Sequence, residues 1–301
     1  MLGVCDYLSF GSESDDINLL CDAAAMITTE DANNTIKEWL DKGVSYAVAQ
    51  QKAADFHLSG NSNVFNTPNN VLGIEYIKAI NKFGSQLNPI TVKRTGGDHD
   101  SDDGYSGSGL RKSFIRNIIP TKLMTEAAAA ISNEEIEVGR GPIMRSAVEL
   151  AILSRLRGIN SYHDVPGISE GLESRFMKYA STEPSVDEVL RKIKTKRYTM
   201  ARLRRILMCA TLGIKTQHVK THPSYIRVLA MNSNGKALLG KARKKTKLPI
   251  LTKPAAVYNL SNSAVQTFEL EAASTDFYSL AYPNKEERTG GKEWRQSPII
   301  I

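Results

Sequence analysis

Three short segments carry residue types that suit nucleotide binding. The first, Gly11-Ser12-Glu13-Ser14, follows a short apolar run. In an open parallel sheet, ligands bind at the carboxyl ends of the strands. A glycine there lets a base or a ribose approach the backbone closely. An ordinary turn glycine would look the same, so this segment alone does not separate ligand binding from a plain turn.

The second and third segments each precede a predicted helix. In Pro68-Asn69-Asn70, the Asn70 amide and the helix N-terminus can face a nucleotide, although Asn is also a common helix cap. In Ser106-Gly107-Ser108-Gly109-Leu110-Arg111, the hydroxyls and the first helical N–H groups suit a phosphate. Arg111 can bind phosphate oxygens through two N–H groups. A serine cap followed by a surface arginine is the alternative for this segment taken alone.

The elements that must position these segments alternate between strand and helix. Residues 4–10 and 89–92 have strand composition. Helices are expected from Ile17, after Thr28 or Thr29, from Ser45 to residue 54, and from Asn69 or Asn70 onward. Ser108 opens a further helix that ends at residue 116. This alternation is typical of an open parallel sheet.

The chain changes character after Pro120, where we place a domain boundary. The residues beyond it form mostly helices, with short strands such as residues 226–229 in the tail. The predicted helices cover residues 123–130, 145–156, 171–179, 186–193 and 199–212.

Length and composition limit the class of protein. With 301 residues, about two domains are expected. The sequence contains no run of about 18 apolar residues, so no membrane span is expected. Its charged start does not resemble a signal peptide. The three cysteines, Cys5, Cys21 and Cys209, are widely spaced, which fits a reducing cytoplasm better than a disulfide framework or a zinc site.

Positive charge is concentrated in the second half of the chain, whose net charge overall is +7. Solvated helix faces would explain one such cluster, but two clusters in the same half favour a polyanionic partner such as nucleic acid. The first cluster is the predicted RNA-binding set and comprises Arg191, Lys192, Lys194, Lys196, Arg197, Arg202, Arg204 and Arg205. The second comprises Lys241, Arg243, Lys244, Lys245 and Lys247.

Other polar groupings in the sequence are weak signals. Residues 97–103 combine a histidine with several aspartates, but their spacing fits no standard metal site, so no bound metal is expected. Trp39 and Trp294 are expected to pack in the interior instead of stacking on bases. No residue can be assigned a catalytic role from the sequence.

Taken together and in this order, the motifs identify a resemblance to tRNA(Met) cytidine acetate ligases, a bacterial family related to the nucleotidylyltransferases. The resemblance runs through nearly the whole chain. It rests on the sequences Phe10-Gly11-Ser12-Glu13-Ser14, Pro68-Asn69-Asn70-Val71-Leu72-Gly73-Ile74-Glu75-Tyr76, the Ser-x-Ser-x-x-Arg element ending at Arg111, Val165-Pro166-Gly167-Ile168-Ser169-Glu170-Gly171-Leu172-Glu173, Lys194-Thr195-Lys196-Arg197-Tyr198-Thr199, Pro223-Ser224-Tyr225-Ile226-Arg227-Val228-Leu229 and Ala273-Ser274-Thr275-Asp276-Phe277-Tyr278.

This resemblance implies a cytoplasmic ligase. Such enzymes convert ATP, with Mg²⁺, and acetate to acetyl-adenylate, and then acetylate the wobble cytidine of elongator tRNA(Met) to N4-acetylcytidine without acetyl-CoA. The implied ATP contacts are Gly11, Asn70, Arg94, Ser106, Ser108 and Arg111. The implied fold is α/β: a Rossmann-like nucleotidylyltransferase domain over residues 1–120, followed by a mostly helical, basic tRNA-binding domain over residues 121–301 with a small α+β tail.

One departure from the family pattern leaves alternatives open. None of the five histidines lies in a His-x-Gly-His motif, which in the family cradles the ATP phosphates. We therefore expect the nucleotide-binding domain to be incomplete and truncated at its N-terminus. The alternatives are an inactive, tRNA-binding relative, or an adenylyltransferase with a different acceptor.

Overall fold

The computed structural model describes residues 2–58, 62–94, 107–116, 118–169, 171–195, 197–219 and 222–301. The chain divides into two compact units. The first spans Gly3–Gly97, and the second spans Asp98–Ile301 together with Met1–Leu2. In the described part of the chain, no helix has both the length and the apolar character needed to cross a membrane.

The first unit combines two strands with helices. Its helices begin where the sequence offers a cap: the Asp16 carboxylate accepts from the N–H groups of Asn18 and Leu19, and the Thr29 and Ser45 hydroxyls cap the next two helices. The elements are β1 (Tyr7–Ser12), α1 (Ile17–Met26), α2 (Glu30–Asp41), α3 (Tyr46–His57), the 3₁₀ helix η1 (Ser62–Phe65), α4 (Pro68–Lys82) and β2 (Asn88–Lys93).

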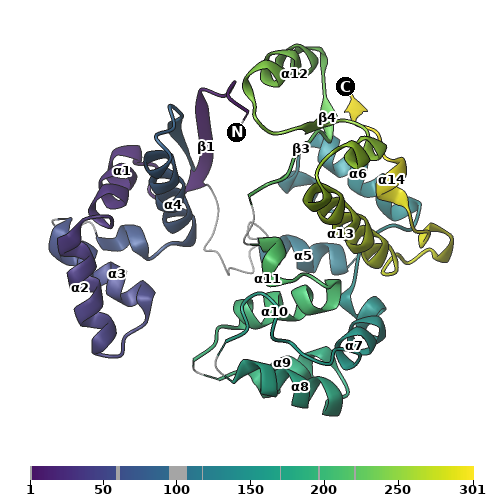
Figure 1. Ribbon diagram of the computed structural model, residues 1–301, viewed down its shortest axis with the longest axis horizontal. Coiled ribbons are helices and arrows are strands. Elements are labelled where there is room, and N and C mark those ends of the chain that lie inside the picture. The colour runs from purple at the N-terminus through teal and green to yellow at the C-terminus, as the bar shows by residue number, and fades with distance from the viewer. Residues whose placement is uncertain are drawn as a thin grey trace. The chain divides into compact units, whose positions relative to one another are not determined.

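The two strands of the first unit pair in parallel, from Tyr7 opposite Asn88 to Ser12 opposite Lys93. The sequence predicted this strand over residues 4–10. In the structure it runs from Tyr7 to Ser12, because these are the residues that pair with β2. α4 packs beside β1 (Figure 1). The contact is close because Gly73 faces the Phe10 ring: a Cβ at Gly73 would lie 2.5 Å from Phe10 Cε2. Both strand C-termini therefore lie at one edge of the unit, near the start of α4.

The second unit is mainly helical, and its described residues form two short pairs of strands in the C-terminal part. The predicted strand over residues 226–229 is interrupted: Ile226–Arg227 pairs with Ile250–Leu251, whereas Ala230–Met231 pairs with Ile299–Ile300. The elements are α5 (Gly107–Ile115), η2 (Thr121–Leu123), α6 (Glu126–Glu137), η3 (Arg145–Val148), α7 (Glu149–Arg157), α8 (Leu172–Thr182), α9 (Val186–Ile193), α10 (Met200–Leu212), α11 (Thr216–Val219), β3 (Ile226–Arg227), β4 (Ala230–Met231), α12 (Ser233–Lys245), β5 (Ile250–Leu251), η4 (Pro254–Asn259), α13 (Asn262–Ser279), η5 (Lys285–Glu287), α14 (Lys292–Arg295) and β6 (Ile299–Ile300).

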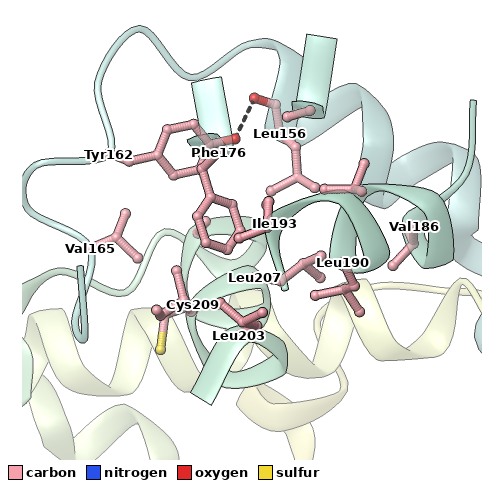
Figure 2. Close-up of a cluster of buried hydrophobic side chains, with 14 of the residues drawn as sticks. Leu156, Tyr162, Val165, Phe176, Val186, Leu190, Ile193, Leu203, Leu207 and Cys209 are labelled. Carbon is pink, nitrogen blue, oxygen red and sulfur yellow. Dashed lines mark hydrogen bonds between the residues drawn. The ribbon is translucent and has the colours of Figure 1, made fainter. Parts of the chain in front are cut away.

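A dense apolar cluster joins α7, α8, α9 and α10. Figure 2 shows the Tyr162 and Phe176 rings among the aliphatic side chains of α9 and α10. The Tyr162 hydroxyl donates to the Leu156 carbonyl oxygen at 2.9 Å. Burial raises the pKa of Tyr162 to about 12, so this hydroxyl stays a neutral donor. Because Ile193 and Leu203 are fully buried, α9 and α10 are held with their polar faces outward.

A second, smaller cluster supports the C-terminal part. Tyr225, Val257 and Phe268 are buried there, and Trp294 packs edge-on against Phe268 with ring centroids 4.7 Å apart. Trp294 thus has the packing role expected from the sequence. Trp39 likewise packs against the apolar core of the first unit.

Candidate nucleotide site and basic surface

The C-terminal ends of β1 and β2 are joined by hydrogen bonds between polar groups. The Arg94 backbone N–H donates to the Ser12 carbonyl oxygen at 2.8 Å. The Ser12 side chain is buried, and its hydroxyl is hydrogen-bonded to the hydroxyl of Thr91 on the neighbouring strand. These bonds continue the parallel pairing to its last residues and fix where the chain leaves each strand.

Asn70 links this strand end to α4. Its side chain is only 3% exposed, and its Oδ1 accepts from the backbone N–H groups of Glu13 and Ser14 at 2.9 and 3.1 Å. The helix begins earlier than predicted: Thr67 is the cap residue and Pro68 occupies the first turn. Asn70 therefore acts as a long-range acceptor, because it binds the turn after β1 instead of capping its own helix.

Glu13 supplies the reciprocal contact. Its carboxylate accepts from Asn69 Nδ2 at 2.7 Å and from the Asn70 backbone N–H at 3.0 Å. The Thr67 side chain makes no cap hydrogen bond, so the Glu13 carboxylate serves the first N–H groups of α4 in its place. Partial burial raises the pKa of Glu13, but the hydrogen bonds from Asn69 and Asn70 outweigh it, and the pKa lies below its usual value.

Arg94 brings positive charge to the same edge. Its Nη1 lies 3.9 Å from Glu13 Oε1, and about a quarter of each side chain is exposed, at 24%. This long ion pair restrains the guanidinium while it remains within reach of solvent. Such a group can bind an anionic oxygen at the strand ends with its remaining N–H groups.

Gly11 and Gly73 both lie in the motifs described above, but they differ in the space that is available for a side chain. At Gly73, a side chain would collide with Phe10. At exposed Gly11, an added Cβ would find only the Val92 carbonyl oxygen, at an ordinary 3.9 Å. Packing within the described chain explains Gly73 but does not explain Gly11, so the predicted ligand contact of Gly11 stays a prediction.

The predicted ATP contacts fall into two groups. Gly11, Asn70 and Arg94 lie together at the strand ends of the first unit. Arg111 lies in α5, in the second unit, and its guanidinium folds back over the first turn of that helix, with Nη1 3.5 Å from the Cβ position of Gly107. Ser106 lies outside the described residues, as does the side chain of Ser108, so their predicted roles stay predictions.

Several residues of this edge were quoted in the sequence motifs without a role. Ser12, Glu13 and Asn69 all take part in the strand-end bonds, and so does Thr91. The position of the acidic residue Glu13 directly after a strand was the one sequence signal for such a role. Its partners Asn69 and Asn70 could not be predicted, because they are 56 and 57 residues away in the chain.

The predicted RNA-binding cations lie around the end of α9 and the start of α10, and the side-chain contacts of Arg202 and Arg191 are well defined. Arg202 donates to the Gly167 carbonyl oxygen and to the Ser169 hydroxyl, each at 2.8 Å. Arg191 makes a two-pronged contact with Glu188 one turn earlier in α9. These two side chains help to fix the loop and the helix that carry the others.

The remaining described cations of this cluster face solvent. Arg204 and Arg205 are exposed on the first turns of α10, and in the part of the chain that the structure describes no ion pair joins either of them to a carboxylate. Lys192, Lys194 and Arg197 are exposed at the end of α9 and in the loop that follows it, whereas Lys196 lies outside the described residues. The second basic cluster, on α12 and just after it, is exposed too: Lys241, Arg243, Lys244, Lys245 and Lys247.

No metal centre is evident among the residues described here, since they contain no group of three or more His, Cys, Asp or Glu side chains placed to hold an ion. The histidine and aspartates of residues 97–103 lie in the stretch that the structure does not describe.

Comparison with known proteins identifies the class. Residues 1–293 match the HIGH Nucleotidyl Transferase family. The crystal structure of apo TmcAL from Thermotoga maritima superposes with a TM-score of 0.88 at 28% identity, covering 100% of this chain and 78% of the other. The same protein bound with alpha-thio ATP gives a TM-score of 0.86 at 29% identity, covering 100% and 77%. The chain is a nucleotidyl transferase of α/β fold, as predicted.

Relatives of known name narrow the class to one family. The tRNA(Met) cytidine acetate ligase of Acetivibrio thermocellus is 32% identical over 325 residues, covering 100% of this chain and 78% of its own length. The ligase of Thermoanaerobacter pseudethanolicus is 33% identical, covering 94% and 73%. The chain belongs to the tRNA(Met) cytidine acetate ligase family, which confirms the predicted family. The predicted N-terminal truncation stays a prediction.

Proposed function

We propose that this protein ligates acetate to a cytidine of tRNA(Met) with ATP as the energy source. One observation carries the proposal: the whole chain aligns with the ligase of Acetivibrio thermocellus at 32% identity. The structure supports it with a polar strand edge on one unit and an exposed basic surface on the other.

The first half-reaction activates acetate. A carboxylate oxygen of acetate attacks the α-phosphorus of ATP, which enters as its magnesium complex. The bond from that phosphorus to the bridging oxygen breaks, and pyrophosphate leaves with the electron pair. Negative charge grows on the α-phosphate oxygens and on the leaving group, so donors held ready for those oxygens lower the barrier.

The strand edge suits this step. Gly11 leaves room for the adenosine, and Asn70 holds the turn after β1 in place through Glu13 and Ser14. Arg94 offers guanidinium N–H groups at the same edge. Ser106, Ser108 and Arg111 complete the proposed set of ATP contacts and would border the triphosphate.

The second half-reaction transfers the acetyl group. The N4 amine of the wobble cytidine attacks the carbonyl carbon of acetyl-adenylate, AMP leaves, and the amine loses a proton to give N4-acetylcytidine. The elongator tRNA would lie on the cations around α9 and α10, which neutralise backbone phosphates without reading the sequence. No acetyl-CoA enters either step.

The test measures pyrophosphate release from ATP with radiolabelled acetate, with and without tRNA(Met). We expect release that requires acetate, and label on the tRNA only when all three substrates are present. Pyrophosphate release that ignores acetate would contradict the proposal.

A second candidate is a relative that binds tRNA(Met) without turning over ATP. One observation favours it: the sequence contains no His-x-Gly-His motif. The same experiment separates the two, because this candidate predicts tRNA binding with no acetate-dependent release of pyrophosphate.

A further inference from the structure

The second unit contains a polar recess whose lining includes no residue of α9 or α10. Its volume is about 430 Å³, and it is lined by Arg140, Thr275, Tyr282, Lys292, Arg295 and Gln296. Three of these side chains are cationic, the other three are neutral hydrogen-bonding groups, and no carboxylate belongs to the lining. Such a set of groups suits an anion with several oxygens.

Arg140 is held firmly at the recess. Its Nε and Nη2 donate to the two carboxylate oxygens of Glu135 at 2.8 and 2.6 Å, and its Nη1 lies 3.4 Å from Glu287 Oε2. The backbone before it is clamped, because the Asn284 N–H donates to the Gly139 carbonyl oxygen at 3.0 Å. Gly139 has a φ of +76°, and a Cβ there would lie 2.5 Å from Asn284 Cβ.

Lys292 and Arg295 come from one short helix, α14. Lys292 Nζ lies 3.2 Å from Glu287 Oε2 and 4.6 Å from the centre of the Tyr282 ring. Arg295 donates to the carbonyl oxygens of Gly290 and Gly291 at 2.8 and 3.3 Å. An ammonium has three N–H donors and a guanidinium five, so each cation keeps donors beyond these contacts. Their ordering is thus largely complete before an anion binds.

We infer that this recess binds a backbone phosphate of the tRNA substrate; this inference rests on the proposed function. Two carboxylates, Glu135 and Glu287, contact the cations from outside the lining. A third, Glu293, accepts from the Thr275 hydroxyl of the lining, but its charge is paired with Arg227. Positive charge therefore prevails inside the recess. The recess belongs to the unit that carries both exposed basic clusters, and none of the four described ATP contacts, Gly11, Asn70, Arg94 and Arg111, lines it. An RNA phosphate therefore fits its position better than a phosphate of ATP.

The test uses the full chain and an elongator tRNA(Met) transcript, with affinity measured at several salt concentrations. The variant carries Lys292→Gln and Arg295→Gln, and the control carries Lys285→Gln, which removes an exposed charge of η5 that does not line the recess. Each lost phosphate contact should reduce the slope of log K against log salt by about 0.7–0.9. We expect the double variant to bind on the order of ten-fold more weakly with a shallower slope, and the control to match the wild type.

Three results would overturn the inference. The first is a double variant that binds tRNA as the control does. The second is a double variant that no longer binds inorganic phosphate, as measured by calorimetry, but binds tRNA with unchanged affinity. This result would show that the recess is a site for a small free anion. In either case wild-type binding of tRNA would leave the proposed function intact. The third is a wild-type chain that binds no tRNA, which would remove both proposals together.

The single Arg295→Gln variant protects the test against misfolding. Arg295 is exposed, and within the described residues its side chain donates to the backbone carbonyl oxygens of Gly290 and Gly291. Its thermal midpoint should equal that of the control, and its salt slope should fall by about one contact.

Discussion

The strand edge of the first unit and the basic surface of the second differ in how their polar groups are satisfied. At the strand edge, Glu13 and Asn70 bind each other's segments, and little of Asn70 reaches solvent. On α10, Arg204 and Arg205 face solvent above a buried apolar row. The hydrogen bonds of the first arrangement hold the strand-end groups in one position, as a reaction at phosphorus requires. The second supplies charge that a large polyanion can meet in many orientations.

The largest effect should follow from breaking the strand edge at Asn70. The change Asn70→Ala leaves the N–H groups of Glu13 and Ser14 without their acceptor, and each such group costs about 1–3 kcal/mol when buried. We expect a clear fall in the stability of the first unit and loss of ATP binding. Chemical denaturation and ATP titration measure the two effects. The exposed Asn81→Ala change in the same helix is the control, and equal stability of the two variants would contradict the account.

The basic surface should respond in the opposite way. Replacing Arg204 and Arg205 by Ala should leave stability within about 0.5 kcal/mol, because both side chains are exposed. The affinity for tRNA(Met) should fall on the order of ten-fold or more at low salt, with the slope of log K against log salt reduced by about 1.5. Lys37→Ala with Lys82→Ala, both exposed in the first unit, removes the same charge elsewhere. An unchanged salt slope in the Arg204 and Arg205 variant would remove this surface from the proposal.

Two glycines sharpen the comparison within the first unit. Gly11→Ala should keep or slightly raise stability, since a strand glycine costs about 0.5–1 kcal/mol relative to Ala. It should weaken ATP binding if the ligand approaches here. Gly73→Ala should instead cost about 1–3 kcal/mol by forcing Phe10 to move. Thermal unfolding and ATP titration of both variants decide the matter, and normal ATP affinity in Gly11→Ala would exclude Gly11 from the site.

A smaller effect concerns pH. The pKa of Glu13 is lower in the folded chain than its ordinary value of 4.5, so the ionised carboxylate stabilises the first unit. This stabilisation is complete above the ordinary value and is lost as pH falls through the lower, folded-state pKa. The Glu13→Gln variant should therefore lose less stability than the wild type as the pH is lowered from about 5 to below the ordinary carboxyl value of 4.5. Thermal midpoints across this range measure it, with Glu38→Gln as the exposed control; parallel curves for Glu13→Gln and wild type would contradict it.

Local signals in the sequence predicted much of the fold. The caps at Thr29 and Ser45, the strand over residues 89–92 and most helices of the second half are present in the structure. The helix predicted over residues 123–130 lies instead at Glu126–Glu137, because Thr125 caps it. The start of α4 was misplaced, because two asparagines look like caps while Pro68 suits the first helical turn equally well.

Contacts between distant segments could not be predicted. The sequence placed Asn70 in a nucleotide site but could not show that Glu13, 57 residues earlier, holds its backbone N–H. Arg202 looks like its basic neighbours in the sequence, yet its guanidinium is bound to Gly167, 35 residues away. Hydrogen bonds over such separations depend on the tertiary fold, which no local pattern encodes.

The two half-reactions, measured separately, test the division of work between the two regions most directly. Acetate-dependent pyrophosphate release without tRNA follows the first step, and labelled acetate on tRNA(Met) follows the second. We predict that Gly11→Ala loses both activities, whereas the Arg204 and Arg205 variant keeps the first and loses most of the second. Loss of both activities in the Arg204 and Arg205 variant, or normal activation of acetate in Gly11→Ala, would contradict the account.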